Sequence, residues 1–130
     1  MSIETTHAPM TFAAGDRLEF PWRPESPVLV NDRLMAAAIR SRAALIAVAC
    51  TGQTITYKGL SAAIGGLYPY RRLGGLLDAI TLDCINRGEQ SLAALVVRTG
   101  THTPGSGFVH GGAEPIGSYQ LRLHHHWQQH

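Results

Sequence analysis

Two shortages in this sequence, of cysteine and of charge, exclude whole classes of protein. The two cysteines, Cys50 and Cys84, are too few for a small domain held together by disulfide bonds. Charged residues make up only 15% of the chain and apolar residues 45%, a composition that excludes an intrinsically disordered chain. With 130 residues, the chain is long enough to form one domain with a hydrophobic core of its own.

Segments that would direct the chain to a membrane are also lacking. The first residues show neither the basic n-region nor the apolar h-region of a secretory signal, and no run of about 18 apolar residues occurs. The apolar stretch Ala36–Cys50 is interrupted by Arg40 and Arg42, which is typical of a buried helix. We therefore expect a soluble, cytoplasmic protein that does not enter a membrane.

The excess of positive charge is small and unevenly placed. The net charge is +2, and residues 1–50 are neutral, with five arginines and five acidic residues. Residues 51–130 hold six basic and four acidic residues. Because affinity for DNA grows with the number of phosphates neutralised, this balance excludes strong non-specific coating of DNA but allows binding at a limited site.

Residues 1–30 are expected to form an irregular N-terminal arm. They hold four of the seven prolines and show no sustained hydrophobic period. A short edge strand is expected around Arg17–Phe20. The aromatic side chains expected to anchor the arm to the body are Phe12, Phe20 and Trp22.

The first helix is predicted to begin after Asn31 and to end near Ala49. Asn31 is a good N-cap, and Asp32 places a negative charge in the first turn, where the helix dipole favours it. Apolar residues then recur near the 3.6-residue period until Thr51-Gly52, a pair that ends helices. The arginines expected on its solvent-facing side are Arg33, Arg40 and Arg42.

A brief strand at Ile55 and a short second helix are expected next. Thr56 is placed to cap a helix over residues 57–64, and Gly65-Gly66 to stop it.

The third helix is predicted over residues 69–87, with Pro69 at its first position and Gly88 after its end. Gly74 and Gly75 are unusual there, because each glycine inside a helix costs roughly 0.5–1 kcal/mol relative to alanine. Either close helix–helix packing or the approach of a ligand would explain them.

Residues 92–98 read as a continuous apolar strand, residues 99–107 as a glycine-rich turn, and residues 108–110 as the returning strand. A terminal helix is expected over residues 118–129. The resulting order of helix, helix, strand, wing and strand is that of an α+β, winged helix-like fold, with three helices and a small β-hairpin wing. The expected segments are the arm (1–30), the winged-helix domain (31–112) and a C-terminal helix or tail (113–130).

Segment 52–112 carries three short patterns that share one resemblance. They are Gly52, Thr54, Thr56, Tyr57, Gly59 and Leu60; Arg71-Arg72-Leu73-Gly74; and Gly107-Phe108 with Gly111-Gly112. Together they resemble the C-terminal domain of the O6-alkylguanine-DNA alkyltransferases and the alkyltransferase-like proteins. The same signature is also similar to that of small uncharacterised bacterial and phage proteins.

The enzymes of that family carry Pro-Cys-His-Arg at the end of the strand before the wing. Aligned on Arg98, this chain has Leu95-Val96-Val97-Arg98. Alkyl transfer needs a thiolate and a base that lowers its pKa, and valines stand at both positions. The resemblance therefore predicts a non-enzymatic member.

What the resemblance implies for this chain is a way of binding DNA. Tyr57 would abut the phosphate of a rotated nucleotide, Arg71 would enter the base stack, and Gly74 and Gly75 would let the helix press into the minor groove. Hydroxyl groups and glycine N–H groups of the wing are candidate phosphate contacts. The residues expected to contact DNA are Tyr57, Lys58, Tyr70, Arg71, Arg72, Gly74, Gly75, Arg98, Thr99, Thr101 and Ser106.

No cofactor or metal is expected. The glycine-rich turn lacks the Gly-Lys-Ser/Thr ending of a nucleotide-binding loop. The consecutive histidines at 124–126 point around a helix and converge poorly on one ion. Cys84 and Cys50 are expected to be buried and structural.

The leading hypothesis is a protein that binds double-stranded DNA without catalysis. The alternative is a protein-interaction module on the same scaffold, a subunit or inhibitor in a bacterial defence, phage or mobile-element system. The low net charge, the aromatic arm and the Trp127 tail favour this alternative. The stripe of Tyr119, Leu123 and Trp127 is either core or a partner surface. An enzyme that uses Cys84 would instead show a reactive thiol in the folded state.

Overall fold

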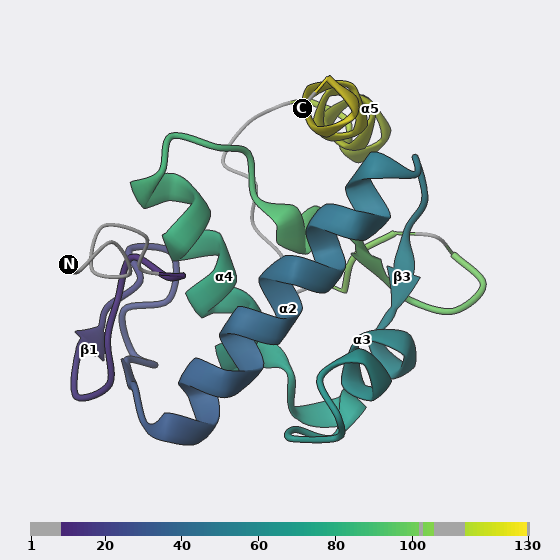
Figure 1. Ribbon diagram of the computed structural model, residues 1–130. Coiled ribbons are helices and arrows are strands. Elements are labelled where there is room, and N and C mark those ends of the chain that lie inside the picture. The colour runs from purple at the N-terminus through teal and green to yellow at the C-terminus, as the bar shows by residue number, and fades with distance from the viewer. Residues whose placement is uncertain (1–8, 102, 106–113, 130) are drawn as a thin grey trace, which may run out of the picture.

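Helix α2 (Asp32–Cys50) runs through the middle of the molecule in the computed structural model, which describes residues 9–101, 103–105 and 114–129 (Figure 1). The Asn31 side chain accepts a hydrogen bond of 2.8 Å from the Leu34 N–H, and Gly52 has a φ of 73° just past the helix end. Both limits predicted for this helix are therefore confirmed. Neither α2 nor any other helix in the described ranges is long and apolar enough to cross a membrane.

Three further helices contact α2 and complete a mixed α+β structure. In the view of Figure 1, α3 (Tyr57–Ala63) and α4 (Gly74–Asn86) flank α2 on opposite sides, and α5 (Ile116–Gln128) lies near its C-terminal end. The buried face of α2 is lined by small side chains, which allow neighbouring elements to approach it closely. These small buried residues are Ala37, Ala38, Ser41 and Ala49.

The N-terminal arm is held by a short strand pair and by aromatic burial. Strand β1 (Arg17–Leu18) pairs antiparallel with β2 (Val28–Leu29). The predicted edge strand is thus confirmed over its first two residues. Phe12 and Phe20 are buried in the main core, so the arm packs onto the body as expected.

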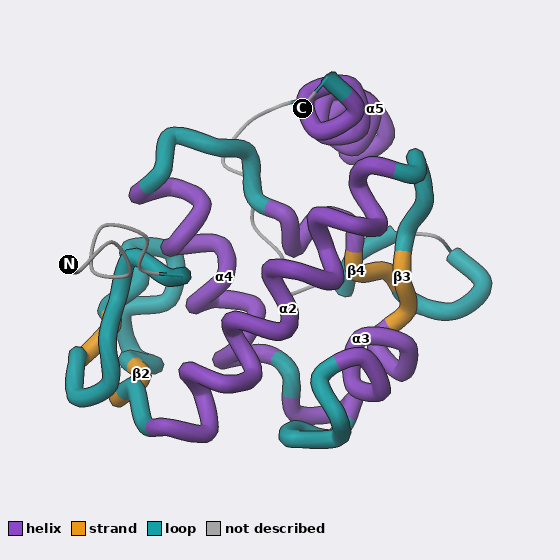
Figure 2. The backbone as a smooth tube through the Cα atoms, viewed as in Figure 1, coloured by secondary structure: helices purple, strands orange, loops and turns teal. Residues whose placement is uncertain are grey.

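The second strand pair joins segments far apart in sequence. Strand β3 (Ile55–Thr56) pairs parallel with β4 (Val96–Val97), with Ile55 opposite Val96 (Figure 2). Residues Leu92–Leu95 form the 3₁₀ helix η2, not a strand, so the prediction of a continuous strand over 92–98 is wrong in its first half. The Ser91 hydroxyl accepts from the Ala93 N–H and caps this turn, which explains why the apolar run coils before it extends.

The predicted third helix is interrupted. A 3₁₀ turn, η1 (Tyr70–Arg72), comes first, and α4 begins only at Gly74. Leu73, with φ −90° and ψ −4°, separates the two and turns its side chain into the core, where it is 2% exposed. Gly74 and Gly75 are consequently the first two residues of α4 and do not lie in a helix interior, which corrects the sequence interpretation. The predicted end at Gly88 is confirmed, with φ 73°.

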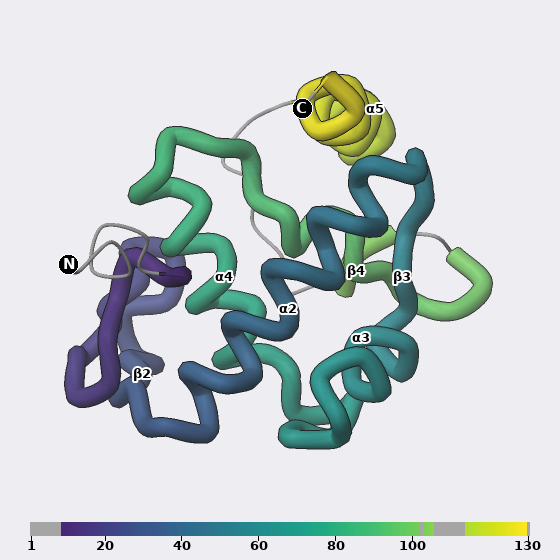
Figure 3. The backbone as a smooth tube through the Cα atoms, viewed as in Figure 1, coloured from purple at the N-terminus to yellow at the C-terminus, as the bar shows by residue number. Residues whose placement is uncertain are grey.

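The predicted second and C-terminal helices are confirmed with small shifts. Thr56 caps α3 by accepting from the Gly59 N–H at 3.0 Å, and α5 begins two residues earlier than expected. Tyr119 and Leu123 are buried, and Trp127 packs against the same core. The stripe therefore belongs to the core and not to a partner surface, and Figure 3 shows α5 beside the C-terminal end of α2. The expected returning strand at 108–110 and the glycines at 107, 111 and 112 lie outside the described residues.

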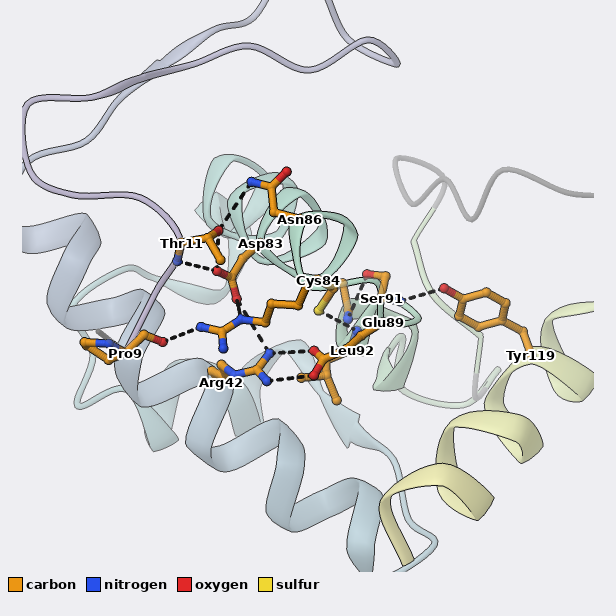
Figure 4. Close-up of polar contacts among 12 residues, drawn as sticks. Pro9, Thr11, Arg42, Asp83, Cys84, Asn86, Glu89, Ser91, Leu92 and Tyr119 are labelled. Carbon is orange, nitrogen blue, oxygen red and sulfur yellow. Dashed lines mark hydrogen bonds and ion pairs between the residues drawn. The ribbon is translucent and has the colours of Figure 1, made fainter. Parts of the chain in front are cut away.

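A buried ionic network ties the arm, α2 and α4 together (Figure 4). The Asp83 carboxylate, whose side chain is 1% exposed, accepts from the Thr11 N–H and hydroxyl at 2.7 Å each and from Arg87 Nε at 2.9 Å. Arg42 lies 3.6 Å from the same carboxylate and makes a two-bond pair with Glu89. Arg42 is therefore not on the solvent side, and that prediction is wrong: α4 and the turn after it cover this face of α2.

Replacing Asp83 by asparagine should destabilise the fold by about 2–4 kcal/mol, because Arg87 loses its described carboxylate partner and Arg42 loses one of its two. Urea denaturation measures this change. Glu19→Gln is the matched control, since its pair with Arg17 is 66–74% exposed on both sides and surface pairs contribute little. Equal effects of the two substitutions would contradict a special role for the Asp83 network.

Candidate nucleic-acid interface

The basic side chains of this protein fall into two groups according to their partners. Five arginines form ion pairs with carboxylates: Arg17, Arg23, Arg42, Arg87 and Arg122. The other six of the eleven basic residues have no carboxylate partner within the described part of the chain. These six are Arg33, Arg40, Lys58, Arg71, Arg72 and Arg98.

Five of the unpaired cations come from three neighbouring elements, α2, α3 and η1, and we call them the basic face (Arg33, Arg40, Lys58, Arg71 and Arg72). Arg33 Nε donates to the Leu67 carbonyl at 2.7 Å, and Arg40 Nη1 donates to the Ile64 carbonyl at 3.3 Å. Both bonds fasten α2 arginines onto the loop between α3 and η1. No acidic residue occurs in the sequence between Asp32 and Asp78, so Asp32 at the start of α2 is the one carboxylate of these elements, and it forms no ion pair with the described cations.

Aromatic rings hold several of these cations in place. The guanidinium of Arg33 lies 4.2 Å from the centre of the Tyr68 ring. Lys58 and Arg71 lie 5.1 and 5.4 Å from the centre of the Tyr70 ring, and Arg71 Nε also donates to the Tyr70 hydroxyl at 3.0 Å. Cation–π contacts of this kind order a charged side chain while leaving its outer N–H groups able to donate to phosphate.

Tyr57 joins the start of α3 to the segment that follows β4. Its hydroxyl accepts a hydrogen bond of 2.7 Å from the Gly105 N–H. A Cβ at position 105 would lie 2.6 Å from that hydroxyl oxygen, so only glycine allows this approach. The Arg98 N–H donates to the Thr103 carbonyl at 2.8 Å and closes a turn that presents Arg98, Thr99 and Thr101 to solvent.

A cavity of about 570 Å³ lies between the arm, η1 and the start of α4, and we call it the arm cavity. Five residues expected to contact DNA line it: Tyr57, Tyr70, Arg71, Gly74 and Gly75. Lys58 and Arg72 lie on the basic face beside it, and Arg98, Thr99 and Thr101 on the turn after β4. Ser106 lies outside the described residues.

The two glycines at the start of α4 do not serve close helix packing. A Cβ added at Gly74 would meet no atom of the described chain within 4 Å, and one at Gly75 would come no nearer than 3.6 Å to Val28 Cγ2, an ordinary contact. The remaining explanation for Gly74 and Gly75 is the approach of a ligand, since both residues line the arm cavity.

Several residues of this region were not expected from the sequence. Arg33 and Arg40, expected only as solvent-facing arginines of the first helix, belong to the basic face, and the acid-free stretch between Asp32 and Asp78 is the signal that could have indicated this. Trp22 and Asp78 line the arm cavity from segments 56 residues apart, and no short-range pattern in the sequence indicates such a pairing.

The two cysteines differ in exposure. Cys84 is fully buried, as expected, and this burial raises the pKa of its thiol to about 11. Cys50 is exposed, so the prediction that it is buried is wrong. It lies in the last turn of α2, with Sγ 3.5 Å from the Trp127 carbonyl.

The positions of the resembled family's cysteine and histidine are occupied by Val96 and Val97, which are buried in β4.

The histidines of α5 are spread around the helix. His124 Nδ1 lies 3.1 Å from the Ala49 carbonyl oxygen, and the His126 ring meets the Trp127 ring edge-on. Over the described ranges, no three histidine, cysteine or acidic side chains gather in a way that would hold a metal ion.

Comparisons with known proteins give no match for this chain among protein-family models, curated proteins or solved structures. The alkyltransferase resemblance therefore stays a prediction from the sequence, and the question of function depends on the surface chemistry of the chain itself.

Thiol labelling should distinguish the two cysteines. At about pH 8 the Cys84 thiol stays protonated and shielded, because its pKa is about 11 and only the thiolate reacts. The folded protein should release one equivalent of chromophore from Ellman's reagent, and two in urea. Cys50→Ser should abolish labelling of the folded protein, and rapid labelling of that variant would revive an enzymatic role for Cys84.

Proposed function

We propose that this chain is a non-catalytic protein that binds double-stranded DNA through its basic face. The observation that carries the proposal is the division of its cations. The acidic side chains of α4 and the turn after it are used in internal pairs, while five cations on α2, α3 and η1 have no carboxylate partner in the described structure. A cluster of unpaired, ordered cations is the electrostatic footprint of a surface that meets phosphates.

We further propose a winged helix-like mode of contact, with α3 and α4 as the helix pair and the turn at 98–105 as the wing. The exposed residues of helix α4 lie at its two ends, and six of its 13 residues, all between Leu76 and Cys84, are buried, so the middle of the helix is not available to a groove. Contact falls instead on η1, immediately before α4, where Tyr70, Arg71 and Arg72 are carried. Recognition helices likewise contact DNA through their N-terminal ends.

The proposed interaction is modest in strength and involves no chemistry on the DNA. Six unpaired cations can neutralise at most six phosphates, so the slope of log K against log salt should be no steeper than about −5. The aligned positions Val96 and Val97 offer no nucleophile or base, and the Cys84 thiol is held in its unreactive form.

The alternative, a protein-interaction module, has less support. Two of the three features that favoured it, the aromatic arm and the Trp127 tail, are engaged within the chain: Phe12 and Phe20 are buried, and Trp127 packs against the core. DNA is therefore the proposed partner. A failure to bind DNA would favour the alternative hypothesis, a protein partner.

Fluorescence anisotropy with short labelled duplexes at several salt concentrations tests the proposal. Arg72→Ala and Arg40→Ala should each weaken binding about three- to tenfold at low salt and reduce the magnitude of the salt slope by about one, because each removes a phosphate contact. Arg17→Ala is the matched control: it removes the same charge, but from an exposed residue of β1 that pairs with Glu19.

Two outcomes would contradict the proposal. One is an equal loss of affinity in Arg17→Ala, which would show that only net charge matters. The other is the lack of any salt-sensitive binding by the unaltered protein, which would make a protein partner the leading hypothesis.

A further inference from the structure

We infer that the arm cavity is a binding site for a free small molecule that joins a planar aromatic ring to an anionic group, of about the size of a nucleoside monophosphate. The inference concerns the interior of the cavity and does not depend on DNA binding by the basic face.

The walls of the arm cavity suit a flat ring. Trp22 comes from the arm, Tyr57 from the start of α3 and Tyr70 from η1, with Val28 and Leu73 among the aliphatic lining. The volume of about 570 Å³ lies within the range of about 300–1,000 Å³ usual for small-molecule sites. Aromatic walls favour planar ligands, because rings gain by offset or edge-to-face stacking.

Among the described residues that line the cavity, the one carboxylate is already neutralised. Asp78 accepts from Trp22 Nε1 at 2.9 Å and from Arg23 Nε at 2.8 Å, and its side chain is only 13% exposed. These bonds fix the Trp22 ring in the wall and leave the carboxylate with no unmatched charge to attract a cationic ligand.

Several hydrogen-bond donors that line the cavity, in contrast, have no acceptor among the described residues. The Tyr57 hydroxyl accepts from the Gly105 N–H, and the Tyr70 hydroxyl accepts from Arg71 Nε. Their own protons have no acceptor among the described residues, and neither do the terminal nitrogens of Arg71. Two phenol protons and a guanidinium with no paired anion call for a ligand rich in acceptors and negatively charged.

The shape of the site favours a ligand of limited size. Its walls come from the arm, the start of α3, the η1–α4 segment and Gly105, so they surround the ligand from several directions. Walls on several sides can bury most of the surface of a small molecule, as ligand sites usually do.

Trp22 provides a direct test, because it lines the cavity and the only other tryptophan, Trp127, lies in α5. In a Trp127→Phe background, the four nucleoside monophosphates and phenyl phosphate are titrated while tryptophan emission is followed. At least one should quench it saturably, and the matching nucleoside or inorganic phosphate alone should bind at least about tenfold more weakly. Calorimetry on the unaltered protein repeats the test without any substitution.

Two glycine variants test whether the probe binds in the cavity or elsewhere on the protein surface. Gly75 and Gly117 are each the second residue of a 13-residue helix, and leucine is compatible with both backbones. Leucine at 75 projects toward Val28, across the cavity wall, and should weaken binding at least about tenfold. Gly117→Leu, where an added Cβ meets no described atom within 4 Å, should leave binding unchanged, and melting curves verify that both variants fold.

Two arginine variants test the anion. Arg71→Met should reduce the affinity for the best monophosphate to that of its nucleoside, whereas Arg72→Met, outside the cavity lining, should not change it. Arg72→Met also separates this inference from the proposed function, because it should weaken DNA binding alone. The inference is overturned if no probe binds the unaltered protein at millimolar concentration, or if Gly75→Leu and Gly117→Leu behave alike.

Discussion

The carboxylate of Asp83 is the constraint on which the arrangement of this protein depends. It lies in α4, fully enclosed, and draws Thr11 of the arm and Arg42 of α2 to one point (Figure 4). A buried charge is tolerated only when it is paired and hydrogen-bonded, so arm, α2 and α4 must take up one mutual position. That position also forms the arm cavity, because the arm that Asp83 holds supplies Trp22 and Val28 to its wall.

The same internal pairing explains why a chain with a net charge of only +2 can present a basic surface. Three carboxylates each pair with an arginine inside the structure: Asp78, Asp83 and Glu89. Their negative charge is therefore neutralised beside α4. The five cations of the basic face are exposed, and the contacts that the described structure gives several of them are with rings and carbonyl groups. Net charge alone therefore underestimates how strongly one face can attract an anion.

The features that could be predicted from the sequence are those set by neighbouring residues. The Asn31 and Thr56 caps and the glycines after each helix locate α2 and α3 because their hydrogen bonds span only three residues. The break at Leu73 could not be read this way, since the burial of Leu73 by distant elements overrides a helical pattern. The burial of Arg42 and the bond between Thr11 and Asp83, 72 residues apart, likewise depend on tertiary packing. The individual site residues Tyr57, Tyr70 and Arg71 were predicted, but not the cavity that they share with Trp22.

The break at Leu73 links the two proposed sites. A continuous helix from Pro69 would have carried Tyr70 and Arg71 around a helical surface, whereas the 3₁₀ turn sets both at the rim between the arm cavity and the basic face. One guanidinium cannot fully serve a ligand anion and a DNA phosphate at the same time. If DNA and the small molecule bind as proposed, occupancy of one site would therefore lower affinity at the other, and linkage requires the effect to be reciprocal. Since a single charge-assisted contact is shared, the coupling is limited to about 1–3 kcal/mol, enough to tune DNA binding without abolishing it.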